Sequence, residues 1–264
     1  MQRPDVEISS AFCLYPKRGG RDSVEYLAVR DVTFSIFPGE FFCLLGPSGC
    51  GKSTVLRMVA GFLPVSAGEI LVRGQHVKGP GPDRAVVFQG DTAIFNWLTV
   101  EENISFGPRM RKLPEEKYRD AVAECIRLVG LEGFEKYQPN QLSGGMRQRL
   151  QIARVLVNDP GILLMDEPFG ALDAQTRDIM QQELSRIWSA SKKSVLFITH
   201  DIDEAILLAD RIAIMTAGPG ATIKTVLDVP LPRPRELDGN FLRLRQEVKS
   251  AIHEEVTKSM RQLR

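Results

Sequence analysis

Short hydrophobic runs alternate with helix-like segments along much of this chain. Residues 41–45 are continuously apolar and end at Gly46, and residues 162–165 and 195–199 are two further runs of this kind. Such runs are typical of strands that are buried on both faces of a parallel sheet. A segment with helical spacing over 174–191 separates the last two runs. The pattern predicts an α/β fold built on parallel strands.

Further segments in the first third of the chain also have the pattern of β-strands. Val32, Phe34 and Ile36 alternate with polar residues, as in a half-buried strand, and 69–72 and 85–88 are further strand candidates. The first third of the chain is therefore expected to be rich in β-structure.

The middle of the chain changes to helical spacing. Residues 114–131 carry apolar residues on one helical face, and Ser143 is placed to cap a second helix through its hydroxyl. These features predict a helical subdomain inserted at about 89–158. We expect one domain over 1–229, followed by a proline-rich linker and a C-terminal helix over 230–264.

Charge and hydropathy narrow the class of protein. Lys and Arg total 34 against 33 for Asp and Glu, so no basic excess points to a nucleic-acid partner. No stretch approaches the length of a membrane span, and the N-terminal residues lack the apolar core of a signal peptide. A cytosolic chain that reaches a membrane only through a partner is expected.

The four cysteines are scattered without a C-x-x-C pair, so structural zinc is not expected. Cys43 and Cys125 lie on apolar segments and are expected to be buried and reduced. Cys50 lies in a glycine-rich loop beside Lys52, where a thiol pKa is lowered and alkylation is favoured. The alternative is that Cys50 is a small side chain tolerated in that loop.

The glycine-rich loop is the first segment with assignable chemistry. It follows the apolar run at 41–45 and fits the pattern G-x-x-x-x-G-K-[ST], which binds the phosphates of a nucleoside triphosphate. Its residues are Gly46, Pro47, Ser48, Gly49, Cys50, Gly51, Lys52, Ser53 and Thr54. The glycines let backbone N–H groups turn toward phosphate, and the following helix points its positive end at the same anion. Lys52 is expected to reach the β- and γ-phosphates and Ser53 to bind Mg²⁺.

Two acidic residues follow the apolar run at 162–165. Asp166 stands at the end of this predicted strand, where open α/β sheets bind ligands, and is a candidate for holding Mg²⁺. Glu167 is a candidate general base that polarises the attacking water. The structural alternative, two acids that cap the following helix, is weakened by the Pro-Phe-Gly-Ala-Leu-Asp segment over 168–173.

Three motifs together identify a family. Residues 142–148 read Leu-Ser-Gly-Gly-Met-Arg-Gln, residues 162–168 read Ile-Leu-Leu-Met-Asp-Glu-Pro, and His200 follows another strand. With the phosphate loop, these motifs resemble the ATPase subunit of an ABC transporter, from about Val6 onward. The resemblance implies a P-loop NTPase fold with a mostly parallel core sheet, an N-terminal antiparallel β subdomain and the inserted helical subdomain. It also implies that the chain binds ATP with Mg²⁺ and hydrolyses ATP.

Further roles come from this resemblance alone. Gln89 matches the glutamine that touches Mg²⁺ and the attacking water, and His200 matches the switch histidine that contacts the γ-phosphate and positions Glu167. Asp173 ends the family's D-loop, which communicates across a dimer. Adenine is expected to stack on Tyr15, with Phe12 as the alternative.

The start of the helix at Ser143, Gly144 and Gly145 is a second site suited to an anion. One phosphate chain cannot readily use both this site and the loop of the same chain. The resemblance implies that two ATPase subunits face each other, so that each ATP lies between the loop of one and Ser143 of the other.

Several segments resemble the ATPases of importers for nitrate, sulfonates, taurine and related small anions. They include residues 79–84, 96–99 and 199–205. This implies transmembrane permease subunits as partners, an extracytoplasmic solute-binding protein as an indirect partner, and a position on the cytoplasmic face of the inner membrane. The alternatives are a soluble ABC ATPase acting on DNA or ribosomes and the ATPase of an exporter.

Overall fold

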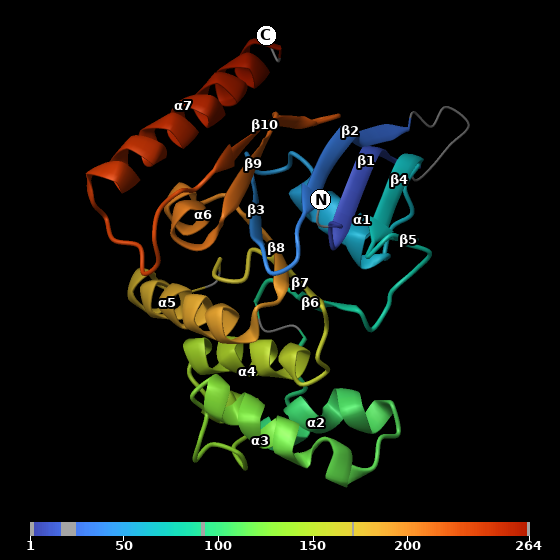
Figure 1. Cartoon of the computed structure of the whole chain (residues 1–264), viewed down its shortest axis with the longest axis vertical. Helices are drawn as coiled ribbons and strands as arrows, with labels where there is room; N and C mark the ends of the chain where they lie inside the picture. Colours follow the sequence, from blue (N-terminus) through green and yellow to red (C-terminus); the bar gives the residue numbers. More distant parts are fainter. Residues whose placement is uncertain (1–2, 17–24, 91–92, 171, 263–264) are drawn as a thin grey trace. The chain divides into compact units, whose positions relative to one another are not determined.

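The computed structural model describes residues 3–16, 25–90, 93–170 and 172–262 (Figure 1). The chain divides into two compact units. Unit 1 joins the first part of the chain, Met1–Gly81, to the last part, Ser194–Arg264, and unit 2 is formed by Pro82–Lys193.

An antiparallel sheet forms the N-terminal part of unit 1, as the resemblance implied. The strand order is β2-β1-β4-β5, and Figure 1 shows β1, β2 and β4 side by side. The strands are β1 (Val6–Tyr15), β2 (Tyr26–Ile36), β4 (Ala67–Val72) and β5 (Gln75–His76). The alternation at Val32, Phe34 and Ile36 is confirmed, because all three side chains are buried in β2.

A second group of strands in unit 1 carries the core. β3 (Phe41–Leu45) pairs in parallel with β8 (Ser194–Thr199) and with β9 (Arg211–Met215), and β10 (Ile223–Asp228) is antiparallel to β9. Every residue of β3 and β8 is buried. The continuous apolar runs therefore form parallel strands buried on both faces, as predicted.

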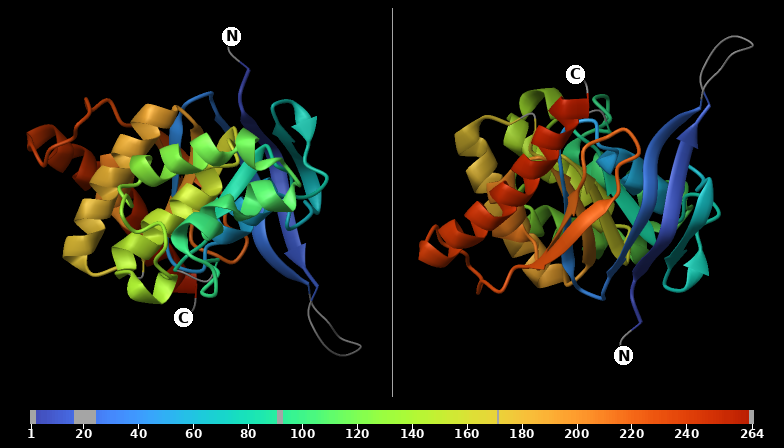
Figure 2. Two further views of the ribbon diagram at one scale, coloured as in Figure 1. Left: turned by 90° about the horizontal axis from the view of Figure 1, so that it is seen from below. Right: turned by 90° about the horizontal axis from the view of Figure 1, so that it is seen from above.

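Three helices accompany these strands: α1 (Lys52–Ala60), α6 (Ile202–Leu208) and α7 (Gly239–Gln262). α1 ends at Gly61, whose φ of 79° is the left-handed conformation that commonly ends a helix. α7 confirms the predicted C-terminal helix, and residues 263–264 lie outside the described residues. Figure 2 shows α7 lying beside the β9–β10 hairpin.

Unit 2 contains a parallel strand pair and most of the helices. β6 (Arg84–Val87) pairs with β7 (Ile162–Asp166), so the ends of these two strands lie together. The helical elements are α2 (Val100–Met110), η1 (Glu115–Lys117), α3 (Arg119–Leu128), η2 (Pro139–Gln141), α4 (Gly144–Leu156) and α5 (Ala174–Ser191). The helix predicted over 114–131 is therefore a short 3-10 turn followed by α3.

The buried amide of Asn103 organises the loop that precedes α2. Its nitrogen donates to the carbonyls of Phe95, Leu98 and Thr99, each at 3.0 Å, and its oxygen accepts from the Phe95 N–H, also at 3.0 Å. The ring of Phe95 in turn lies under the guanidinium of Arg154 from α4, 4.4 Å from its ring centre. These contacts fix the start of the helical region.

Candidate functional site

The phosphate loop lies at the end of a buried strand of unit 1. Leu45 of β3 pairs with Thr199 of β8 and with Ile214 of β9, so the loop starts between two neighbouring strand ends. Gly46 follows β3 directly, and α1 begins at Lys52. This strand–loop–helix order is the context that the sequence motif requires.

Two glycines of the loop hold conformations that favour glycine. Gly49 has φ of 79°, and Gly51, which precedes α1, has φ of 99°. A β-carbon on Gly51 would lie 2.5 Å from Cγ1 of Val29 in β2. Both the backbone conformation and the close approach of β2 therefore exclude a larger residue at Gly51.

The ammonium group of Lys52 is folded over the loop. It donates to the carbonyl of Gly46 at 2.8 Å and to that of Pro47 at 3.1 Å, and the residue is only 4% exposed. The first turn of α1 contains no acidic residue. A positive charge and the positive end of a helix therefore coincide at the loop, which suits a phosphate group.

The structure distinguishes between the two interpretations of Cys50, a readily alkylated thiol or a small side chain tolerated in the loop. Its thiol is fully buried, and Sγ lies 4.0 Å from Sδ of Met215 in β9. A reagent cannot reach this sulfur unless the loop opens, so the prediction of ready alkylation is wrong for this conformation. The structure agrees with the alternative, in which Cys50 is a small side chain that fills space beneath the loop.

Tyr15 and Phe12 occupy different surroundings on β1. The hydroxyl of Tyr15 lies 3.4 Å from Oγ1 of Thr54, the last residue of the loop motif. Phe12 pairs with Ala67 of β4. The contact of Tyr15 with Thr54 favours Tyr15 over Phe12 as the candidate for adenine stacking.

His200 follows β8 and is exposed. The residues on either side of it are held by hydrogen bonds: Oγ1 of Thr199 donates to Glu204 at 2.6 Å, and the N–H of Asp201 donates to Oγ1 of Thr199 at 3.0 Å. Asp201 also caps α6 by accepting from the N–H groups of Asp203 and Glu204. This support was not predicted, although an Asp directly before a helical segment is an ordinary N-cap signal.

The ends of β6 and β7 bring three predicted residues of unit 2 together. Val87 pairs with Met165, so Gln89 and Asp166 each follow shortly after the same register position. A β-carbon on Gly170 would lie 3.1 Å from Nε2 of Gln89 and 3.8 Å from Oε2 of Glu167. Nε2 of Gln89 and Oε2 of Glu167 thus both lie within 4 Å of the same point beside Gly170.

The backbone of Glu167 is strained. Its φ is 43°, in the left-handed region that residues other than glycine rarely adopt, and its carbonyl accepts from the N–H of Gly170 at 3.1 Å. Such strain typically costs about 1–3 kcal/mol and is concentrated at functional sites. The strained residue therefore lies in the tight turn directly after β7.

The second predicted anion site lies at the start of α4. Ser143 is its N-cap, with Oγ accepting from the N–H of Met146 at 3.3 Å, and both Ser143 and Gly144 are exposed. Gly145 is buried, and a β-carbon there would lie 3.0 Å from Cγ2 of Thr176 in α5. The first turn of α4 contains no acidic residue, so its positive end is available to an anion.

Asp173 is the N-cap of α5. Its Oδ1 accepts from the N–H of Thr176 at 3.0 Å, and this hydrogen bond lowers the pKa of the carboxyl group below its usual value. Thr176 thus donates a hydrogen bond to Asp173, and its methyl group lies beside Gly145. The D-loop and the Ser-Gly-Gly segment are therefore neighbours within unit 2.

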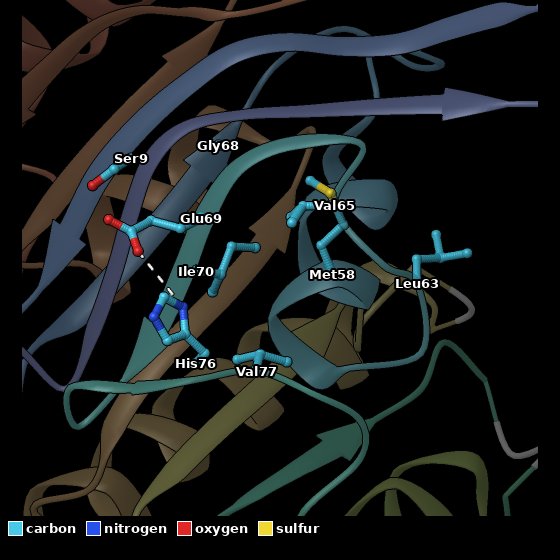
Figure 3. Close-up of a pocket in the computed structure, with 9 residues that line it drawn as sticks. All are labelled: Ser9, Met58, Leu63, Val65, Gly68, Glu69, Ile70, His76 and Val77. Atoms are coloured by element: carbon cyan, nitrogen blue, oxygen red, sulfur yellow. Dashed lines mark ion pairs between the residues drawn. The ribbon is translucent and has the colours of Figure 1, made fainter.

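A separate cavity of about 450 Å³ lies in unit 1. Met58 of α1 and Ile70 of β4 line it, and an ion pair between Nδ1 of His76 and Oε2 of Glu69, 3.6 Å apart, stands at its edge (Figure 3). Its lining contains none of the predicted site residues, so the candidate site is defined by the motifs and not by this cavity.

Comparisons with known proteins agree with the motifs. Residues 29–170 match the ABC transporter family. The nitrate import ATP-binding protein NrtD of Synechococcus elongatus is 46% identical over 229 residues, which cover 84% of this chain and 83% of that protein. The taurine import ATP-binding protein TauB of Pelagibacter ubique is 44% identical over 235 residues, which cover 85% of this chain and 87% of that protein.

A solved structure shows the same fold. It is a dimeric ATP-binding cassette in a post-hydrolysis state, bound to ADP and Pi, and it aligns with a TM-score of 0.70 at 30% identity. The alignment covers 85% of this chain and 98% of that one. This chain therefore belongs to the ABC transporter family, as an ATP-binding and ATP-hydrolysing subunit.

Proposed function

We propose that this protein energises the import of a small anion or a related organic solute of the nitrate, sulfonate or taurine type. The observation that carries the proposal is the similarity, over more than four fifths of the chain, to nitrate and taurine import ATP-binding proteins. The transported molecule is recognised by other subunits, because the motifs of this chain all concern the nucleotide.

In unit 1, the loop residues over 46–54 hold the phosphates of ATP through backbone N–H groups and the ammonium of Lys52. The support for this role is the folding of Lys52 over the loop and the absence of acidic residues in the first turn of α1. Tyr15 stacks on adenine, a role supported by its contact with Thr54.

The oxygen donors of the motif residues fit Mg²⁺, which prefers a few hard protein ligands together with phosphate oxygens and water. Ser53 supplies a hydroxyl, Asp166 a half-buried carboxylate and Gln89 an amide oxygen. Mg²⁺, when bound, would neutralise phosphate charge during hydrolysis.

In unit 2, the carboxylate of Glu167 accepts a proton from the attacking water as general base. Gln89, which faces the same point as Glu167, orients that water. In unit 1, His200 contacts the γ-phosphate, and the hydrogen bonds around Thr199 and Asp201 keep its backbone in place.

Hydrolysis takes place in a dimer of ATPase subunits. Ser143, Gly144 and Gly145 of one subunit bind the γ-phosphate of the ATP held by the loop of the other, and Asp173 carries information across the interface. The positive end of α4 supports the first role, because Ser143 and Gly144 are exposed and the first turn of α4 contains no acidic residue. The dimeric cassette with ADP and Pi is a structural precedent.

The partners of the dimer are transmembrane permease subunits, which in turn receive solute from an extracytoplasmic binding protein. Within the described residues, no helix has the length and apolar character needed to cross a bilayer. We place the ATPase on the cytoplasmic face of the membrane, held there by the permease.

The test is affinity purification of tagged Glu167→Gln protein from solubilised membranes of its host, with ATP and without it. Mass spectrometry then identifies the proteins that remain bound only with ATP. The Lys52→Ala variant is the matched control, because it should lose ATP-dependent capture.

Recovery of a multi-span permease that lacks an ATPase domain would support the proposal. Uptake of labelled nitrate and taurine by cells with and without this gene then separates import from export. Recovery of DNA- or ribosome-associated proteins alone would contradict the transport role and leave the ATPase chemistry intact.

A further inference from the structure

The turn between β9 and β10 packs directly on the backbone of the phosphate loop. A β-carbon on Gly218 would lie 3.0 Å from the carbonyl oxygen of Gly49 and 3.3 Å from Cα of Cys50. Both neighbours are main-chain atoms of the loop, so they can yield only if the loop itself moves. The φ of Gly218 lies outside the left-handed region. The small size of Gly218 therefore matters here, and its backbone freedom does not.

The residue that ends β9, Met215, also packs against the loop. A β-carbon on Gly46 would lie 3.1 Å from Cβ of Met215 and 3.4 Å from its carbonyl oxygen. The sulfur of Met215 lies 4.0 Å from that of Cys50. Residues 215–222, which we name the brace, thus touch the loop at its first residue and again at its tip.

The brace is fixed to β2 by three hydrogen bonds. The N–H of Gly220 donates to the carbonyl of Leu27 at 2.8 Å, and the N–H of Arg30 donates to the carbonyl of Ala221 at 2.9 Å. Oγ1 of Thr222 donates to the carbonyl of Asp31 at 2.9 Å. These bonds leave the turn little freedom to move away from the loop.

β2 also touches the loop itself. A β-carbon on Gly51 would lie 2.5 Å from Cγ1 of Val29 and 3.2 Å from the carbonyl oxygen of Ala28. The loop is therefore enclosed by the brace at Gly46, Gly49 and Cys50 and by β2 at Gly51.

α7 holds the same hairpin from the outside. Nζ of Lys224 in β10 donates to the carbonyl of Ala251 at 3.0 Å and to the carboxylate of Glu254 at 2.6 Å, and it lies 3.1 Å from that of Glu255. Figure 2 shows α7 running along the β9–β10 hairpin. The brace is thus anchored both to β2 and, through β10, to the C-terminal helix.

We propose that the brace positions the phosphate loop for ATP, with Gly218 as its positioning residue. A loop that grips phosphate through backbone N–H groups binds tightly only if those groups already point at the anion. Packing of Gly218 on Gly49 and Cys50 keeps them in that orientation. The proposal rests on the nucleotide-binding role of the loop and adds to it a determinant of ATP affinity outside the known motifs.

The experiment compares purified wild type, Gly218→Ala and Gly239→Ala by steady-state ATPase kinetics and by equilibrium binding of ATP. Gly239→Ala is the matched control because a β-carbon there meets nothing within 4 Å. Gly218→Ala should raise KM and the dissociation constant of ATP about tenfold, a change of about 1.4 kcal/mol, with kcat within about twofold. A general loss of folded protein would lower kcat and leave KM unchanged.

If Gly218→Ala does not fold, a second pair of variants tests whether the brace positions the phosphate loop. Thr222→Val removes the hydrogen bond to Asp31 without adding bulk, and Thr222→Ser keeps it. We expect KM to rise about threefold in the first variant and to stay at the wild-type value in the second.

Two results would overturn the proposed role of the brace. One is a KM for folded Gly218→Ala within twofold of that for Gly239→Ala, and the other is equal KM values for both Thr222 variants. If wild type itself neither binds nor hydrolyses ATP, the role of the loop is what fails. ATP binding measured apart from turnover separates these two cases.

Discussion

Nε2 of Gln89 lies 3.1 Å from the point that a β-carbon on Gly170 would occupy. Gly170 ends a tight turn that starts at Glu167, because its N–H donates to the carbonyl of Glu167. Gly170 therefore leaves open the space beside Nε2 of Gln89, and Oε2 of Glu167 lies 3.8 Å from the same point. Its φ lies outside the left-handed region, so an alanine would keep the backbone and fill that space.

Gly170→Ala is expected to lower kcat for ATP hydrolysis about three- to tenfold, because small displacements of orienting groups cost much of the rate. ATP affinity should change less than kcat, since the groups proposed to hold the phosphates belong to the loop over 46–54. Steady-state kinetics and equilibrium ATP binding measure the two effects. Gly79→Ala is the control, because its new methyl group meets open space; equal kcat values for the two variants would refute the role of Gly170.

Glu167→Gln keeps the shape of the side chain and removes the base. We expect ATP binding to persist and hydrolysis to fall about 10²-fold or more. Because closure then outlasts chemistry, saturating ATP should convert the variant to a dimer in sedimentation velocity. Near-normal turnover would exclude Glu167 as the base, and a monomer at saturating ATP would exclude the two-subunit arrangement.

The strands that carry the motifs could be predicted because they are continuous apolar runs, a signal that depends little on distant residues. α2 was not predicted, since Gly107 and Pro108 interrupt its pattern. Its start was nevertheless readable: Thr99 and Glu102 form a capping box in which each side chain accepts from the backbone N–H of the other.

The environment of the site residues was harder to predict than their identity. Burial of Cys50 depends on Met215, which is distant in sequence and becomes a neighbour only because β3 and β9 pair. The sequence argument considered the charges next to Cys50 and had no means of locating Met215. The shared orientation of Gln89 and Glu167 likewise depends on the register of β6 and β7.

Stability should fall at alkaline pH through Cys125 of α3, because burial raises the pKa of its thiol to about 11 from a usual value of 9.0. The folded state thus keeps the proton while the unfolded state loses it. Below pH 9 the thiol does not change the free energy of unfolding. As the pH rises past 11, it lowers the free energy of unfolding by about 2–3 kcal/mol.

Urea unfolding of wild type and Cys125→Ala, at several pH values between 7.5 and 10.5, measures how the contribution of Cys125 to the free energy of unfolding depends on pH. Wild type should be the more stable protein at pH 7.5, because alanine leaves a void at this buried position. Its advantage should shrink as the pH rises, while the other buried thiols cancel in the comparison. A constant difference would show that Cys125 does not titrate as inferred.

Ser143 combines a structural role with a proposed role in binding, and two substitutions separate them. Asn and Asp both cap helices about as well as Ser, so Ser143→Asn and Ser143→Asp should preserve α4. Only Asp places a negative charge where the γ-phosphate from the other subunit would bind.

Ser143→Asp is therefore expected to reduce cooperative ATP hydrolysis at least about tenfold, the effect of about 1.4 kcal/mol of repulsion. Ser143→Asn should stay within about threefold of wild type. Neither change should alter ATP binding to the monomer, because the phosphate loop of the same chain is untouched. ATPase rates as a function of protein concentration, with ATP binding measured at low concentration, test both statements. A Ser143→Asp monomer that no longer binds ATP would place Ser143 at its own subunit's nucleotide and refute the exchange between subunits.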